Sequence, residues 1–182
     1  SSNKHARTNT GVYVGCMSTE YPHILKGANM ANNAGTGTGS GISFLCGRVS
    51  YVMGFKGPCI SIDTACSSSL AATHLGRTAI IAHECDTATI AGTNIMIAPQ
   101  TTQGVCNLQA LAVDGRCKTL DATANGYGRA EAIAAVIIAN ANDTHTNMLK
   151  MPVNIVASFV NQDGRSSSLT APNGPSQSTL IS

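Results

Sequence analysis

The apolar positions of this chain fall into short runs separated by glycine, proline and polar residues. Runs of this length that are apolar almost throughout are typical of strands buried on both faces of a sheet. The expected strands are residues 11–16, 57–63, 86–97, 130–140 and 154–160. Pro58 lies at the start of the second run, and Gly92 interrupts the third.

Two segments between these runs carry apolar residues at roughly helical spacing. Residues 42–54 predict a helix that stops at Gly54, because glycine commonly ends helices. Residues 67–84 predict a helix with no clean polar face, so we expect it to be buried on most sides. Residues 99–112 predict a further helix or an irregular segment. Strands that alternate with helices indicate an α/β layered domain whose sheet is covered on both faces.

The glycine-rich segment GANMANNAGTGTGSG, residues 27–41, is expected to be a loop. It does not fit a phosphate-binding pattern, since no GxGxxG register is present and no Gly-Lys-Ser/Thr follows. A tight backbone crossing near the functional site is the better interpretation. A linker-like loop is expected at residues 142–148.

Composition limits the function classes. The chain has 182 residues, enough for one domain, and only 11% are charged, against about 25% in typical domains. We therefore expect it either to form the interior of something larger or to bury a face against a partner. With 18 glycines and no tryptophan, packing should rely on close backbone approach.

A net charge of +2 without a basic cluster argues against nucleic acid as a partner, and no apolar run approaches the roughly 20 residues of a membrane span. Neither end shows a natural start or stop, so we expect both to be truncated.

Seven cysteines are present, with no CxxC or zinc-ribbon spacing. An odd count without a signal peptide favours reduced thiols and a cytoplasmic location, with a plastid as the alternative. His83 and Cys85 flank Glu84, but no further ligand is nearby, so no metal site is expected. Apart from Cys66, the cysteines are expected to be mostly core residues.

Cys66 lies in IDTACSSSLAATHLG, between an apolar run and three serines that start a predicted helix. Free N–H groups and the dipole of a helix N-terminus stabilise a thiolate at such a junction. We expect Cys66 in a turn between a strand ending near Asp63 and a helix starting near Ser67. From spacing alone, a catalytic nucleophile and a buried structural cysteine are equally supported.

Several motifs resemble those of β-ketoacyl synthase domains, most closely those of type I polyketide synthases. DTACSSSL, residues 63–70, resembles the active-site signature of that family. The other matching segments are GVYVGCMSTEY (11–21), GRVSYVMGFKGPCISIDTACSSSLAATHL (47–75), LAVDGRCKTLDATANGYGRAEA (111–132) and VNQDGRSSSLTAPNGPSQ (160–177). The resemblance covers nearly the whole chain.

The resemblance implies the thiolase fold, a layered α/β/α/β/α arrangement of two similar halves. Residues 1–182 would form part of one β-ketoacyl synthase domain, mostly its N-terminal half and the start of its C-terminal half. It also implies that Cys66 accepts an acyl chain from an acyl carrier protein. A malonyl-type extender then undergoes decarboxylative Claisen condensation. The family binds no cofactor directly, since phosphopantetheine is carried on the acyl carrier protein. A homodimer through the strand before Cys66 is implied as well.

The chain departs from the family in its histidines. The family uses two, in HGTGT-like and NxGH-like motifs, and neither motif exists here. The five histidines, at positions 5, 23, 74, 83 and 145, match neither context. His74 is about two helical turns beyond Cys66 and is expected to pack the helix. We therefore expect the chain alone to be inactive in condensation.

Two further departures concern the acyl channel. Ala130 and Ala132 stand where the family usually has glycines around Glu131, and residues 165–168 differ from the usual small loop residues. Extra methyl groups could crowd a close backbone contact there. No substrate-binding residue is assigned from the sequence.

Two other functions remain as alternatives. One is a non-catalytic, chain-length-type partner subunit of the same fold, but such subunits typically replace the nucleophile, and Cys66 is present. The other is a cysteine hydrolase, which needs a histidine base and an orienting Asn or Asp. No local signature indicates either group.

Overall fold

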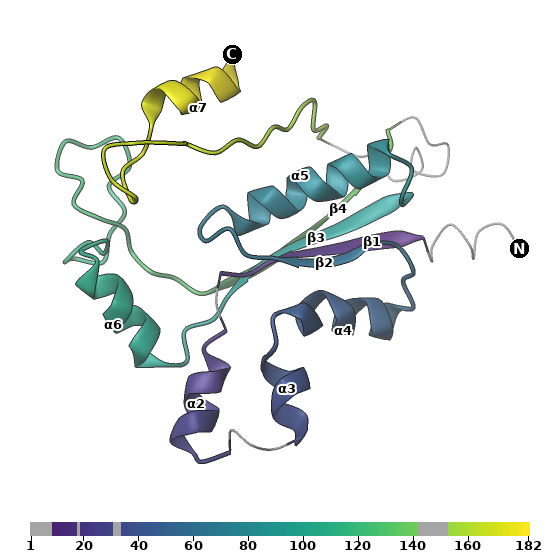
Figure 1. Ribbon diagram of the computed structural model, residues 1–182, viewed down its shortest axis with the longest axis horizontal. Helices are drawn as coiled ribbons and strands as arrows, with labels where there is room; N and C mark the ends of the chain where they lie inside the picture. Colours follow the sequence, from purple (N-terminus) through teal and green to yellow (C-terminus); the bar gives the residue numbers. More distant parts are fainter. Residues whose placement is uncertain (1–8, 18, 31–33, 142–152) are drawn as a thin grey trace, which may run out of the picture.

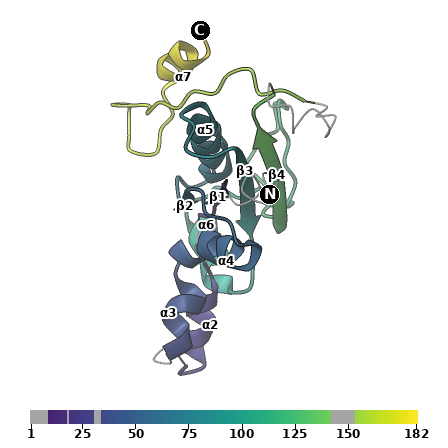
Figure 2. The ribbon, with the colours of Figure 1, turned by 90° about the vertical axis from the view of Figure 1, so that its right-hand side faces the viewer.

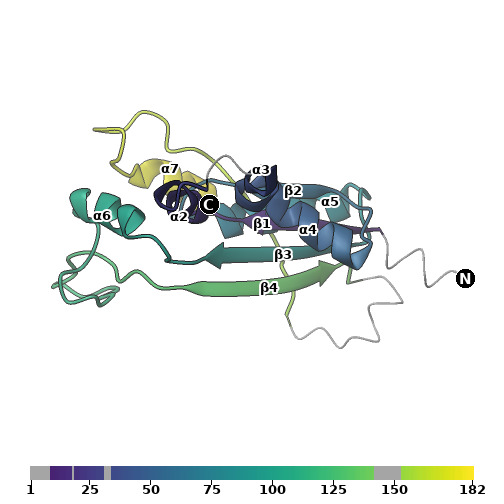
Figure 3. The same ribbon diagram turned by 90° about the horizontal axis from the view of Figure 1, so that it is seen from below.

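A four-stranded sheet forms the centre of the computed structural model, which describes residues 9–17, 19–30, 34–141 and 153–182 (Figure 1). The strands are β1 (Thr10–Gly15), β2 (Cys59–Ile62), β3 (Thr87–Asn94) and β4 (Ala132–Ala139), in the order β2-β1-β3-β4. β1 is parallel to β2 and β3. β4 runs antiparallel to β3, as the arrows of these two strands in Figure 3 show. Four of the five expected strands therefore form.

The helices are α2 (Tyr21–Gly27), α3 (Ala34–Ser40), α4 (Ser43–Met53), α5 (Ser68–Ile81), α6 (Pro99–Asn107) and α7 (Gly174–Ile181). The three helical expectations are met by α4, α5 and α6. Gly54 ends α4 in the left-handed conformation, with φ +69°, where glycine carries no Cβ penalty. Helices α2 and α7 were not expected, because each has eight residues or fewer and shows no sustained apolar period.

Alternate residues of β1 point into two apolar clusters on opposite faces of the sheet. Tyr13 packs under α5 in a cluster that includes Ala72 and Ile80. Val12 and Val14 pack on the other face, around Cys46 of α4. Every residue of β1 is buried, as expected for a central strand between two helical layers. The predicted α/β layering is confirmed at this strand.

The predicted burial of the later apolar segments is wrong within this chain. β4 forms, but Ile133 and Ile137 are 72% and 64% exposed, because β4 is the edge strand beside β3 (Figure 3). Residues 154–160 run as extended chain along α5 and pair with no strand of the described part (Figure 1). Arg77 donates to the carbonyl of Val156 at 3.0 Å, so polar contacts rather than a strand ladder hold this segment.

The burial expected for α5 is also too extensive. One stripe of the helix is buried, including Ala72, Gly76 and Ala79, while Leu70 and Ile81 are exposed. Small residues along the buried stripe allow close packing. A Cβ added to Gly76 would lie 3.2 Å from the side chain of Ile90 on β3.

The glycine-rich segment 27–41 is not a continuous loop, because residues Ala34–Ser40 form α3. α2 and α3 lie side by side away from the sheet (Figure 2), and no tight crossing occurs at Gly37, where a Cβ would meet nothing within 4 Å. The interpretation as a backbone crossing near the functional site is therefore wrong at this glycine. The loop expected at 142–148 lies outside the described residues.

Two glycines at or near the ends of strands allow α5 to approach the sheet closely. A Cβ on Gly15, the last residue of β1, would lie 2.5 Å from the amide nitrogen of Ser69. A Cβ on Gly92 of β3 would lie 3.0 Å from the Cβ of Ser69. The first turn of α5 therefore rests directly on the ends of two strands.

Substitution of Gly15 by Ala should destabilise the full-length protein by about 1–3 kcal/mol, since backbone must move to admit the methyl group. Gly47→Ala is the matched control, because a Cβ at Gly47 in α4 meets nothing within 4 Å. It should be neutral or stabilise by about 0.5–1 kcal/mol. Thermal unfolding followed by circular dichroism measures both, and equal melting temperatures for the two variants would contradict the prediction.

Candidate active site

Cys66 lies in the turn between β2 and α5, as the sequence predicts. β2 ends at Ile62, Ser67 is the N-cap residue, and α5 begins at Ser68. Cys66 is exposed and its thiol is free. The interpretation of Cys66 as a buried structural cysteine is therefore wrong in this structure.

Hydrogen bonds hold this turn in an unusual backbone conformation. Ala65 has φ +57°, in the left-handed region that non-glycine residues seldom adopt. Asp63 Oδ1 accepts from the Ala65 amide at 2.9 Å, and Ser68 Oγ donates to the Ala65 carbonyl at 2.5 Å. Ser67 Oγ donates to the Thr64 carbonyl at 2.7 Å. The serines after Cys66 thus stabilise the strained turn that presents the thiol.

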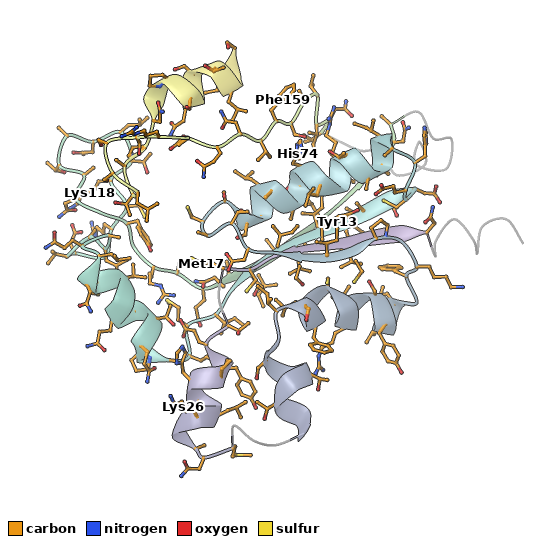
Figure 4. The ribbon with its side chains drawn as sticks, viewed as in Figure 1. Tyr13, Met17, Lys26, His74, Lys118 and Phe159 are labelled. Atoms are coloured by element: carbon orange, nitrogen blue, oxygen red, sulfur yellow. The ribbon has the colours of Figure 1, made fainter. Side chains whose placement is uncertain are left out.

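Cys66 opens onto a cavity of about 520 Å³, in the size range of small-molecule sites. Its walls come from the ends of β1 and β3, the start of α5, and residues 127–136. Figure 4 labels Met17, which lines the cavity just after β1. The lining is mostly small and apolar, with a few polar groups that include Ser69, Asn94 and Arg129.

The structure brings some of the sequence-selected residues to this cavity and leaves others elsewhere. Ala130 and Ala132 line it together with Cys66. Arg165 and Ser168 line a separate cavity of about 720 Å³ within residues 162–172. Residues 165–168 therefore do not line the cavity at Cys66 in the described chain.

The histidines of the described chain, His23, His74 and His83, do not line the Cys66 cavity. His74 Nδ1 lies 3.1 Å from Ser158 Oγ and helps to hold residues 154–160 against α5 (Figure 4). His74 is thus a packing residue, as expected. The remaining two histidines, at 5 and 145, lie outside the described residues.

Sequence reasoning missed a buried ion pair behind the cavity wall. Glu20 is 3% exposed, and its Oε1 lies 3.3 Å from Nη2 of Arg129. Its Oε2 accepts from the amides of Ile97 and Ala98, each at 2.7 Å. Burial raises the pKa of Glu20, but the two amides, the Thr101 hydroxyl and Arg129 outweigh it and leave the pKa below its ordinary 4.5. The partners are 109 residues apart, so no local spacing could signal the pair.

The other cysteines divide into two groups. Cys16, Cys46 and Cys85 are buried, as expected for core residues, and burial raises the pKa of the Cys85 thiol. Cys59, Cys106 and Cys117 are exposed, contrary to the expectation that they are mostly core residues. Across the described ranges, no three His, Cys, Asp or Glu residues gather as a metal site, and no helix could cross a membrane.

Comparison with known proteins gives consistent matches. The family model described as "Beta-ketoacyl synthase, N-terminal domain" matches residues 1–144. Pikromycin polyketide synthase component PikAII of Streptomyces venezuelae is 39% identical over 171 residues, which are 94% of this chain and 5% of that protein. Erythronolide synthase EryA2 of Saccharopolyspora erythraea is 38% identical over 174 residues, which are 96% of this chain and 5% of that protein.

Solved structures match over similar lengths. The ketosynthase from module 6 of the bacillaene synthase of Bacillus subtilis 168 has a TM-score of 0.80 and 31% identity, and covers 100% of this chain. The oxazolomycin ketosynthase domain OzmH KS7 of Streptomyces albus JA3453 has a TM-score of 0.80, 32% identity and 94% coverage. The chain spans 31% and 30% of those two chains, so it corresponds to under a third of their length.

The low pKa of Glu20 predicts a pH-dependent stability difference. The ionised carboxylate stabilises the fold above pH 4.5, and this contribution is lost as the pH falls toward the lower folded-state pKa. Glu20→Gln should therefore melt several degrees below the wild type at neutral pH, and the gap should narrow below about pH 4.5. Asp121→Asn, at an exposed carboxylate, is the control and should change little. Melting curves at pH 7 and pH 4 test this, and a gap that widens in acid would contradict it.

Proposed function

The chain belongs to the β-ketoacyl synthase family through its N-terminal domain, and from this premise we propose that Cys66 accepts an acyl chain for decarboxylative condensation in a polyketide synthase. Its mixed α/β sheet matches the N-terminal part of the thiolase-like ketosynthase fold. The observation that carries the proposal is the exposed Cys66 thiol, which a strained turn presents to a cavity at the start of α5.

The first step is transthioesterification. The Cys66 thiol loses its proton, and the thiolate attacks the carbonyl carbon of an acyl thioester. The carbon–sulfur bond to Cys66 forms, the carbon–sulfur bond to the donor breaks, and the donor leaves as a thiolate that takes up a proton. A thiolate suits this exchange, because nucleophile and leaving group are chemically alike. The donor is the phosphopantetheine arm of an acyl carrier protein, which acts as a substrate and is not a resident cofactor.

Backbone amides at the turn would stabilise the oxyanion that forms during this step. The amides of Ser67 and Ser68 already donate to the carbonyls of Thr64 and Ala65, at 3.4 and 3.1 Å. The amide of Cys66 itself is therefore a better candidate donor than the first helical amides. A donor at this position typically contributes about 10²–10³ in rate.

The second step joins two carbon chains. A malonyl-type extender loses carbon dioxide, its carbanion attacks the acyl carbon on Cys66, and the Cys66 thiolate leaves as the new carbon–carbon bond forms. The enolate intermediate needs hydrogen-bond donors. The described histidines do not line the Cys66 cavity, and the family's two histidine motifs do not occur in this sequence. The chain therefore supplies the acyl-accepting half of the reaction, and residues 1–182 by themselves are proposed to be inactive in condensation.

The assembly is proposed to be a homodimer that pairs through β2. Within the described chain, β2 has one strand neighbour, β1, and its other edge is open. Ile60 on this edge strand is 41% exposed. An open apolar edge invites pairing with a second copy or aggregation, and pairing in this way is what the family resemblance implies.

Cys66→Ala should abolish acylation when the full-length protein is incubated with an acyl thioester. Cys106→Ala, at an exposed cysteine that does not line the cavity, is the matched control and should acylate normally. Intact-protein mass spectrometry measures the acyl adduct, and a malonyl carrier protein added afterwards should yield condensed product. Acylation that survives in Cys66→Ala would overturn the assignment. Hydrolysis without condensation would favour the hydrolase, and no acylation of the wild type would favour a non-catalytic subunit.

Ile60→Lys should convert the full-length dimer into monomers at micromolar concentration, because a lysine on an edge strand opposes strand pairing. Leu108→Lys is the control, since Leu108 is 74% exposed at the end of α6 and lies away from β2. Sedimentation velocity distinguishes the two states. A wild-type protein that sediments as a monomer would refute the proposed dimer.

A further inference from the structure

Glu20 connects three segments that are far apart in the sequence and meet behind the Cys66 cavity. It lies shortly after β1, whose last residue, Gly15, lines the cavity. The amides that it accepts belong to Ile97 and Ala98, in the connection between β3 and α6. Arg129, its ion-pair partner, is itself part of the cavity lining.

Further hydrogen bonds fix Arg129 and the two residues that follow it. Arg129 Nη1 donates to Thr102 Oγ1 of α6 at 2.6 Å. Asn94 Nδ2, at the end of β3, donates to the carbonyl of Ala130 at 2.6 Å. Glu131 Oε1 accepts from the amide of Met96 at 2.7 Å. Residues 129–131 are therefore tied to the end of β3, the β3–α6 connection and α6 at three successive positions.

This wall depends on such bonds because it has little regular structure. Residues 108–131 form no helix or strand beyond an isolated bridge between Leu111 and Tyr127. Backbone ladders position the sheet, but they do not position this segment. A carboxylate that accepts from two amides and a guanidinium satisfies its buried oxygens, and loss of one partner would leave a buried charge uncompensated.

We infer that Glu20 and Arg129 are positioning residues for the cavity wall formed by residues 127–132, and that their ion pair sets how an acyl chain fits beside Cys66. The inference rests on the proposed function. The wall presents the methyl groups of Ala130 and Ala132, so the fit concerns the apolar acyl chain and not the reactivity of the thiol. Misplacement of such a wall should weaken binding of the acyl group and leave Cys66 accessible.

The experiment compares Arg129→Met, Arg129→Lys and the wild type in the full-length protein. Arg129→Met should raise the KM for acylation by a medium-chain acyl thioester about tenfold, which is about 1.4 kcal/mol, and change the maximal acylation rate much less. Arg129→Lys keeps the positive charge, so its KM should lie between those of the wild type and Arg129→Met. Alkylation of Cys66 by iodoacetamide, which is too small to need the wall, should be unchanged. Asp114→Asn removes the exposed ion pair with Lys118 and is the matched control.

A second readout keeps this inference separate from the proposed function. This readout is the rate of Cys66 labelling by a long-chain N-alkylmaleimide, divided by the rate of labelling by iodoacetamide. The ratio measures how the wall accommodates an alkyl chain, and it requires no acyl transfer. This ratio should change in Arg129→Met even if the wild type does not acylate, a result that would refute the proposed function alone. If folded Arg129→Met keeps both the wild-type labelling ratio and the wild-type KM, the inference is wrong. It is also wrong if the rates of acylation, iodoacetamide alkylation and maleimide labelling all fall by the same factor.

If Arg129→Met does not fold, Thr102→Val is tested in its place. This substitution removes one hydrogen bond to Arg129 and leaves the ion pair intact. The expected change is in the same direction and about fivefold, which corresponds to the roughly 1 kcal/mol that a single hydrogen bond contributes. If both the KM and the labelling ratio of Thr102→Val equal those of the wild type, the inference is wrong.

Discussion

The first turn of α5 rests directly on the ends of β1 and β3, where the strands carry glycine and no side chain, and the position of Cys66 follows from this contact. Gly15 and Gly92 leave room for Ser69, and the tight turn before α5 then places the thiol at the same edge of the sheet. The cavity lies where these elements end. Strands that run parallel, such as β1, β2 and β3, bring their carboxyl ends together, so one constraint gathers the turn and much of the cavity.

The two sides of the cavity are held by different forces. The side formed by β1, β3 and α5 is fixed by apolar packing and by the hydrogen-bonded sheet. The side formed by residues 127–131 is irregular and is fixed by side chains that bond to backbone groups, chiefly Glu20, Asn94 and Glu131. Apolar packing tolerates small adjustments, whereas buried polar groups need their partners in place. The polar side is therefore the more sensitive to substitution.

Much of this arrangement could be predicted from the sequence. The apolar runs located β1 to β4, and the junction argument placed Cys66 between β2 and α5. The apolar character of residues 130–140 and 154–160 was interpreted as burial. An apolar sequence, however, indicates only that a surface favours burial, and it does not show that another part of the same chain buries it. β4 is at the sheet edge, and the later segment lies along α5 without a strand partner in the described chain. α3 was missed because glycine and threonine are poor helix formers. Glu20 and Arg129 were missed because their pairing depends on the fold and leaves no local pattern.

β1 precedes the other strands of the sheet in the chain and is also the most deeply buried, and this order has a consequence for biosynthesis. Its partners emerge later from the ribosome: Val12 pairs with Cys59, and Thr10 lies 77 residues before its neighbour Thr87. During translation α4, α5 and β3, which cover β1 or pair with it in this structure, are therefore made after it. Nonlocal pairing of this kind slows folding and exposes the nascent segment to misassociation.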